Sequence, residues 1–281
     1  MRNTDAAVEP EVTEVERAQR KRRKLPSLRS VLVPILFVLF LLLVWELIVR
    51  AGIWPRYVLP SPLTVFARVW EGLKDGSIPV AVGQSMKRVA IGYAISVVLG
   101  VSLGIAIARF RLLEESVGVL VSGLGALPSI VWLPLALIWF GLNDNAIIFV
   151  VILGSLLAVT QATSDGVKNI PTLYFRTARN LGATGLTMYF RVVFPAALPQ
   201  VITGMKLGWQ FAWRSLMAGE LIFVTPGIGH LLDVGRNFND AAQVIAVMVV
   251  IVTLGLAVDK LLFARLERWV RFRWGLTGLT A

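Results

Sequence analysis

The sequence predicts an all-α integral membrane protein with six transmembrane helices. Of its 281 residues, 56% are hydrophobic and only 16% are charged, and the mean hydropathy is +0.73. A chain this apolar is not an ordinary soluble domain. Its basic residues cluster at the ends of span-length apolar runs, not along one aromatic-interleaved surface. The formal net charge of +11 therefore reflects membrane topology and not nucleic-acid binding.

The first 30 residues predict a cytoplasmic N-terminal tail, acidic at first and then sharply basic. The apolar run 31–49 that follows is long enough to cross a bilayer. A cleaved secretory signal is the alternative interpretation, but no small-residue cleavage site follows the run. We expect a retained first helix that begins at the cytoplasmic face.

The segment 52–84 predicts an amphipathic helix at the outer membrane interface. Apolar residues recur in it at helical spacing, namely at Phe66, Val69, Trp70 and Leu73. The second span is expected over 89–108. Within it, Gly100 and Gly104 form a G-x-x-x-G pair, which lets another helix approach closely in lipid.

A third span is expected over 117–142, broken by two prolines. Pro128 and Pro134 each remove a backbone hydrogen bond, which kinks a helix. Kinked helices often line a transport path. Ser129 and Trp132 lie beside these prolines and are candidate pathway residues, although a lipid-facing or core position is the alternative for the tryptophan.

Three further spans complete the expected membrane domain, over 146–159, 197–224 and 241–262. A Pro-Gly-Ile-Gly loop signal separates the last two. Lysines and arginines then concentrate on the side that holds both termini, which the positive-inside rule assigns to the cytoplasm. We expect a cytoplasmic tail at 1–30, a six-helix domain at 31–265 and a basic cytoplasmic tail at 266–281.

The fifth span carries charged residues, which are costly in hydrocarbon and tend to face a cavity or a partner. Lys206, Gln210 and Arg214 recur every four residues and can face one path. An arginine there would attract a small anion such as a sulfonate, nitrate or carboxylate. An ion pair with Glu220 is the alternative for Arg214. The candidate pathway residues are Lys206, Gln210, Trp213, Arg214, Glu220, Trp132 and Ser129.

The composition limits what chemistry this chain can perform. There is no cysteine and only one histidine, His230, so a Ser/His/Asp constellation has little to build on. No clustered metal ligands stand out in the sequence. The chain contains no Gly-Lys dipeptide, which excludes the Walker A phosphate loop. Any ATP and magnesium must be handled by another chain, and we expect no cofactor in this one.

The basic, glycine-containing segment 174–199 lies between apolar runs, and its arginines favour the cytoplasmic side. We interpret this segment as a docking surface for a partner. A basic loop that rests on anionic membrane lipid is the alternative.

Part of this segment resembles the signature of membrane subunits of binding-protein-dependent ABC importers. That signature begins Glu-Ala-Ala, continues through a glycine and ends at a Leu-Pro-x-x-x-Pro start of a membrane helix. Here Arg176 replaces the usual glutamate and Thr177 the first alanine. The residues that align with the signature, and that the resemblance implies for coupling to an ATPase, are Arg176, Thr177, Ala178, Arg179, Leu181, Gly182, Ala183, Pro195 and Pro199.

The resemblance implies that a coupling loop at about 168–195 docks in a groove of an ATP-hydrolysing subunit. A small Ala178 would let the helix lie deep in that groove. Gly182 would allow a sharp bend between two short helices without a Cβ penalty. Pro195 and Pro199 suit the first turn of a membrane helix.

The wider resemblance is to the nitrate, sulfonate, taurine and bicarbonate group of these permeases, on residues 59–62, 128–141, Glu220 and 227–229. It implies a type I ABC importer permease fold and a non-catalytic subunit in a bacterial inner membrane. The implied partners are a second copy of this chain, two cytoplasmic ATPases and an extracytoplasmic solute-binding protein. Alternating access would move a small solute, expected to be an anion. A pyrimidine vitamin precursor, an ATP-independent transporter and a membrane enzyme are the alternatives.

Overall fold

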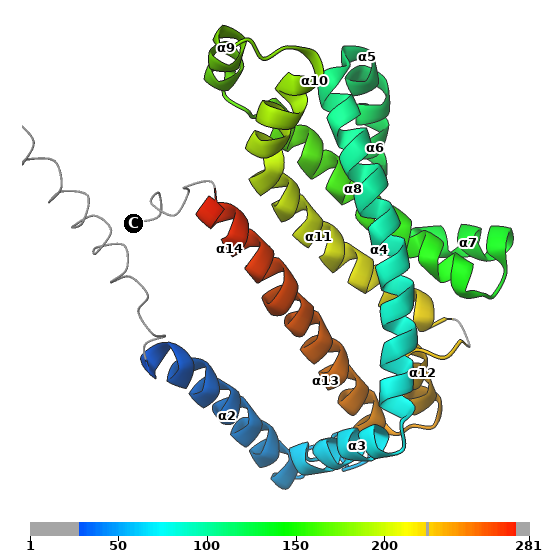
Figure 1. The fold of residues 1–281 in the computed structure, drawn as a ribbon. Coiled ribbons are helices and arrows are strands. Elements are labelled where there is room, and N and C mark those ends of the chain that lie inside the picture. The colour runs from blue at the N-terminus through cyan, green and yellow to red at the C-terminus, as the bar shows by residue number, and fades with distance from the viewer. Residues whose placement is uncertain (1–27, 223–224, 274–281) are drawn as a thin grey trace, which may run out of the picture. The chain divides into compact units, whose positions relative to one another are not determined.

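The computed structural model describes residues 28–222 and 225–273, and its regular elements there are all helical (Figure 1). In chain order, the first half contains α2 Leu28–Arg50, α3 Pro62–Lys74, α4 Ser77–Arg109, α5 Arg111–Leu113, the π-helix η1 Glu114–Gly118, α6 Val119–Gly125, the 3-10 helix η2 Ser129–Trp132 and α7 Leu133–Phe140. The second half contains α8 Asp144–Lys168, α9 Thr172–Asn180, α10 Gly185–Met188, the π-helix η3 Tyr189–Val193, α11 Phe194–Glu220, α12 Ile228–Asn237, α13 Ala241–Val258, the π-helix η4 Asp259–Phe263 and α14 Ala264–Arg273.

The chain divides into two units, residues 1–62 and 63–281. The first unit contains α2, which corresponds to the predicted first span and is apolar along residues 32–50. An exposed ion pair joins Arg50 Nε to Glu46 Oε1 at 2.8 Å near its end. Most of the predicted N-terminal tail lies outside the described residues, and its last three residues already belong to α2.

Four helical segments in the described part of the chain are long and apolar enough to cross a membrane. They are α2, α4, α8 and the continuous stretch 241–270. The pair 111–125 and 129–140 meets the same test together, and α11 is a further long helix whose charged and polar residues make it less apolar. The first four segments and the bent pair correspond to five of the six predicted transmembrane helices, and α11 lies where the fifth span was expected without meeting this test.

The predicted third span differs from the structure, because 117–142 is not one kinked helix. The two helical segments there meet at a bend of 100°. Pro128 directly precedes η2, and Pro134 lies in the first turn of α7. Proline is tolerated at a helix start, where its missing N–H would have no intrahelical partner. The prolines therefore lie at the starts of helical segments, and the chain turns sharply at the break between Gly125 and Ser129.

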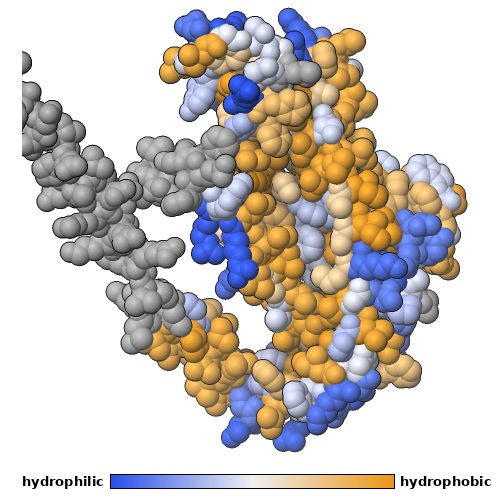
Figure 2. All heavy atoms as spheres, viewed as in Figure 1, coloured by the Kyte–Doolittle hydropathy of each residue, from blue (hydrophilic) through white to orange (hydrophobic). Residues whose placement is uncertain are grey.

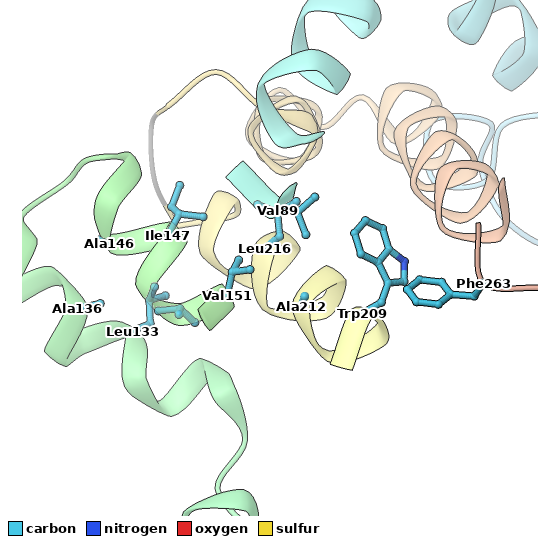
Figure 3. Packing of buried hydrophobic residues seen from close by; sticks show 11 residues of the cluster. Val89, Leu133, Ala136, Ala146, Ile147, Val151, Trp209, Ala212, Leu216 and Phe263 are labelled. Atoms are coloured by element: carbon cyan, nitrogen blue, oxygen red, sulfur yellow. The ribbon is translucent and has the colours of Figure 1, made fainter. Parts of the chain in front are cut away.

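The core of the second unit is formed by α4, α8 and α11, which pack closely along most of their lengths. Glycines allow this approach, as the G-x-x-x-G pair in α4 predicts. A Cβ at Gly104 would lie 2.6 Å from the Thr160 carbonyl oxygen, and one at Gly208 would lie 2.5 Å from a Val159 methyl. Val89, Ile147, Leu216 and neighbouring residues form an apolar core cluster among these helices (Figure 3).

One end of the second unit carries α3 and α12, and the other carries α5, α9 and α10 (Figure 1). Figure 2 shows hydrophilic residues near both ends, with mostly hydrophobic residues and a few hydrophilic patches between them. Phe66 and Trp70 on α3 are exposed, as expected for an interfacial helix, whereas Val65 is buried. Arg68 Nη2 lies 2.5 Å from Asp240 Oδ2 and ties α3 to the start of α13.

Asp240 is also the N-cap of α13, where its carboxylate accepts a hydrogen bond from the Gln243 backbone N–H at 3.0 Å. Partial burial opposes ionisation of Asp240, but this hydrogen bond and the Arg68 guanidinium together hold its pKa below the ordinary value. The hydrogen bonds that Arg68 donates to Asp240 and Glu71 in turn raise the pKa of Arg68. At the far end of this helical stretch, α14 continues to Arg273, so helix extends beyond the predicted domain boundary at residue 265.

Candidate docking segment and solute cavity

The predicted docking segment folds as two short helices, α9 and α10, joined by a tight turn. Gly182 has a φ of +79°. Its N–H donates to the Arg179 carbonyl at 2.9 Å, and the Ala183 N–H donates to the Ala178 carbonyl at 2.9 Å. This pair of hydrogen bonds is the Schellman motif, which places a left-handed residue just after a helix. Gly182 therefore supplies the predicted bend.

The inner face of α9 packs against the protein's own helices. Ala178 is only 6% exposed and lies in an apolar cluster with Ile170, Met188, Val193 and Ala197. We expected its small size to let the helix sit deep in a partner's groove. The structure contradicts that explanation, because Ala178 faces inward and fits α9 onto its own bundle.

The outer face of the docking segment combines apolar and basic residues. Leu181 is 83% exposed and Phe190 is 73% exposed. Further exposed residues are Leu173, Tyr174, Arg176, Thr177, Arg179 and Arg191, while Ala183 is half-buried. Large apolar side chains among basic ones form a surface suited to another protein.

The prolines of the signature occupy two different positions. Pro195 lies in the first turn of α11, as expected. Pro199 lies inside α11, because that helix already begins at Phe194 and follows η3 without a break. Pro199 lacks the N–H that would donate to the Pro195 carbonyl. One turn further on, Thr203 Oγ1 donates to the Pro199 carbonyl at 3.1 Å.

Three of the predicted pathway residues, Ser129, Trp132 and Arg214, line one cavity. It has a volume of about 560 Å³ and lies between α6–η2, α8 and α11. We call it the Arg214 cavity. Its walls are otherwise mostly apolar, and Arg214 is its one charged lining residue. In the described part of the chain Arg214 has no ion pair, and its guanidinium carbon lies 6.0 Å from the centre of the Phe211 ring.

The other predicted pathway residues lie elsewhere. Lys206 Nζ is 3.2 Å from Asp259 Oδ1 on η4. Trp213 stacks on Trp209 with ring centres 6.1 Å apart. Gln210 is exposed and does not line the Arg214 cavity. The predicted stripe of Lys206, Gln210 and Arg214 is therefore divided between different surroundings.

Glu220 is fully buried and lies in a polar cluster at the end of α11. The Oε1 of Glu220 is 2.7 Å from Arg88 Nη1, and Ser85 Oγ donates to the Oε2 at 2.7 Å. The Gly229 N–H donates to its Oε2 at 3.0 Å. Arg88 also reaches Asp144 Oδ1 at 2.8 Å. The alternative pairing of Arg214 with Glu220 is therefore wrong, because Glu220 pairs with Arg88.

Arg88 is the residue that the sequence-based reasoning missed. The expected second span started after it, whereas α4 begins at Ser77 and places Arg88 inside the helix, only 3% exposed. A signal was present, because the small residues Ala81, Ser85, Gly92 and Ser96 recur at helical spacing on both sides of Arg88.

One pattern associated with catalytic serines, Gly100-x-Ser102-x-Gly104, lies in the middle of α4. In hydrolases this pattern forms a sharp turn between a strand and a helix. Here Ser102 Oγ donates to the Val98 carbonyl at 2.7 Å within a continuous helix. The local structure therefore does not form a nucleophile turn.

The fold and the two sites define a class: a multi-helix membrane protein with two short helices, α9 and α10, that carry an exposed face, and a mostly apolar cavity between α6–η2, α8 and α11. Residues 96–272 match the family described as the binding-protein-dependent transport system inner membrane component, and the chain belongs to this family. It is the family of membrane permease subunits of binding-protein-dependent importers, as the signature in the docking segment predicts.

Relatives with assigned names agree with this family. A probable ABC transporter permease of Brucella melitensis is 30% identical over 80% of this chain and 92% of its own length. The nitrate import permease NrtB of Synechocystis is 25% identical over 78% of this chain and 82% of its own. The bicarbonate transport permease CmpB of Synechococcus elongatus is 29% identical, over 82% and 85% of the two chains.

A solved structure supports the fold. A chain of the MetNI methionine ABC transporter, in an inward-facing conformation, superposes with a TM-score of 0.60. The superposed region covers 68% of this chain and 94% of the MetNI chain, at 19% sequence identity. This similarity shows that the two chains share the importer permease fold.

Proposed function

We propose that this protein is the permease subunit of an ATP-driven importer that moves a small anion by alternating access. The observation that carries the proposal is Arg214, an unpaired guanidinium in a mostly apolar cavity within this fold. A permanent charge among apolar walls favours a small anionic ligand. Relatives named for nitrate and bicarbonate import support that substrate class. Sulfonates and taurine belong to the same proposal.

In this proposal, two copies of the chain form the transmembrane pathway in a bacterial inner membrane, with both termini in the cytoplasm. A solute-binding protein delivers the anion from outside. Two cytoplasmic ATPases bind ATP and magnesium and dock on α9 and α10. The chain itself makes and breaks no covalent bonds.

The outward face of the docking segment supplies the ATPase contact. Leu181→Asp places a charge at the exposed tip, and we expect the ATPase no longer to co-purify with the permease. Leu112→Asp is the matched control, because Leu112 on α5 is 77% exposed at the same end but outside the docking segment. Equal ATPase recovery with both variants would reject this docking surface. Failure of the unmodified permease to capture any ATPase would favour an ATP-independent transporter.

Arg214 is tested by uptake of nitrate, bicarbonate and an alkanesulfonate into vesicles that contain the assembled transporter. We expect Arg214→Gln to reduce uptake of the transported anion at least tenfold while basal ATP hydrolysis continues, and Arg214→Lys to retain part of it. Lys206→Gln is the control, since Lys206 pairs with Asp259 away from the cavity. Unchanged uptake by Arg214→Gln would remove Arg214 from the pathway.

A pyrimidine vitamin precursor remains the second candidate substrate. Trp132 and Phe211 both line the Arg214 cavity, and aromatic side chains can stack on a flat heterocycle. Uptake of a pyrimidine that survives Arg214→Gln but is lost in Trp132→Ala would favour this substrate over an anion.

A further inference from the structure

A second cavity lies beside the Arg214 cavity along α8. It has a volume of about 550 Å³ and is lined by the end of α4, by η1 and α6, and by the last turns of α8. We call it the Asp165 cavity. Because α8 ends at Lys168 and α9 begins at Thr172, this cavity lies toward the end of the molecule that carries the docking segment (Figure 1).

The two cavities share one lining residue, Gln161. Its side chain points from α8 toward α6, because a Cβ at Gly125 would lie 4.0 Å from Gln161 Oε1. Gln161 is exposed and makes no hydrogen bond within the described residues. A neutral amide that can both donate and accept therefore lies where the cavities meet.

The two cavities carry opposite charge. Arg214 is the one charged residue that lines the first. The second is lined by Glu114, Asp165 and Lys168. Lys168 Nζ lies 2.8 Å from Glu114 Oε1, so these two charges largely cancel. Asp165 has no cationic partner among the described residues, which leaves this cavity with one net negative charge.

We propose that the two cavities form one solute route, in which Gln161 separates them and Asp165 repels an anion that has passed Arg214. The order of charges favours release toward the docking end over return to Arg214. This role for Asp165 rests on the proposed import of an anion. At separations of several ångströms in a partly hydrated cavity, one carboxylate changes the local concentration of an anion by about tenfold.

The chain contains no cysteine, so a single introduced cysteine reports on each cavity without background. Ser122→Cys places a thiol in the Asp165 cavity, and Ala158→Cys places one in the Arg214 cavity. Inside-out membrane vesicles that contain the assembled transporter expose the docking side. The probes are the anionic reagent sulfonatoethyl methanethiosulfonate and its cationic trimethylammonium counterpart, and the readout is the ratio of their modification rates.

Asp165→Asn should raise the anionic rate about tenfold and lower the cationic rate about tenfold, so the anionic-to-cationic rate ratio at Ser122→Cys should rise about a hundredfold. Glu115→Gln is the control, because Glu115 is exposed, pairs with Arg111 and lines neither cavity. The control should leave the ratio unchanged. A change below twofold with Asp165→Asn, or an equal change with Glu115→Gln, would overturn the charge assignment.

The shared position of Gln161 is tested with substitutions of opposite size. Gln161→Trp should slow modification at Ala158→Cys by both reagents at least fivefold and leave Ser122→Cys unaffected, whereas Gln161→Ala should speed it. If neither variant changes the rate at Ala158→Cys, the cavities are not one route. These rates do not require a transported solute. If the modification-rate ratios change as expected but the transporter takes up no anion, the proposed substrate is rejected. If anion uptake is normal but the ratios do not change, this inference is rejected.

Discussion

Removing the charge of Glu220 should destabilise the protein far more than removing an exposed carboxylate. Glu220 is fully buried, and Arg88 is only 3% exposed, with their charged atoms 2.7 Å apart. Glu220→Gln preserves the size of the side chain but leaves the buried guanidinium with Asp144, which is 47% exposed. Breaking a buried ion pair costs about 3–5 kcal/mol. Because Asp144 still offsets part of the Arg88 charge, we expect Glu220→Gln to lower the free energy of unfolding by about 3 kcal/mol.

The measurement is thermal unfolding of the purified permease in detergent. A loss of about 3 kcal/mol corresponds to a fall of roughly 6–12 °C in the midpoint for a chain of this size. Glu115→Gln is the control, because its ion pair with Arg111 is exposed and should contribute about 0–1 kcal/mol.

A double variant separates the ion pair from the loss of either side chain alone. Arg88→Met combined with Glu220→Gln removes both buried charges, so it should cost about 3 kcal/mol less than the sum of the two single changes. Strict additivity, or a Glu220→Gln variant as stable as Glu115→Gln, would refute the assignment of this cluster as a coupled, buried ion pair.

Three further predictions concern local backbone and charge. Gly229→Ala should lower the free energy of unfolding by about 1–3 kcal/mol, because the new Cβ would lie 2.5 Å from the Glu220 Cβ. The control is Gly123→Ala on α6, whose Cβ would meet nothing within 4 Å and should not destabilise the protein in the same thermal assay. Gly182→Ala should destabilise the α9–α10 turn by about 1–2 kcal/mol because Gly182 has a positive φ, and Gly182→Asn should destabilise it less. The measurement is the rate of proteolysis at this turn, which should be highest for Gly182→Ala, lower for Gly182→Asn and lowest for the unmodified protein. Equal protection of the two variants and the unmodified protein would contradict this prediction. Asp240→Asn should cost about 1 kcal/mol near neutral pH. The pKa of Asp240 is lowered in the folded protein, so the stabilisation by its carboxylate is present above about pH 4 and is lost as the pH falls through the lowered pKa. The thermal unfolding curves of Asp240→Asn and the unmodified protein should therefore converge in acid. Curves that diverge in acid would refute the reasoning.

Much of the fold follows from the sequence because hydropathy and turn chemistry are local properties. Long apolar runs predict the membrane helices, and Gly182 with its neighbours predicts the bend between two short helices. Arg214, Ser129 and Trp132 were expected to line a path, and they meet in one cavity although they belong to different segments. The charge on Arg214 and the prolines near Ser129 drew attention to these residues, and their role in transport stays a prediction.

The missed features depend on tertiary packing. A span search based on hydropathy stops at a charged residue, so it placed Arg88 outside the helix, although its partner Glu220 is distant in sequence and only folding brings them together. The amphipathic pattern of α9 likewise predicts two faces but not which face meets the protein's own bundle. Ala178 was therefore assigned to the wrong face.

The close packing of α8 on α11 has a consequence for how this transporter can change its solute during evolution. Gly154 lines the Arg214 cavity and faces Ser215 so closely that a side chain there has no room, and Gly204 and Gly208 restrict the same pair of helices. New side chains on that wall would separate the helices. The opposite wall, the bent segment 125–132, carries no such constraint at Gly125, where the nearest group is the Gln161 amide at 4.0 Å. Diversification of selectivity among related permeases should therefore concentrate on the bent segment, while the paired helices keep their small residues.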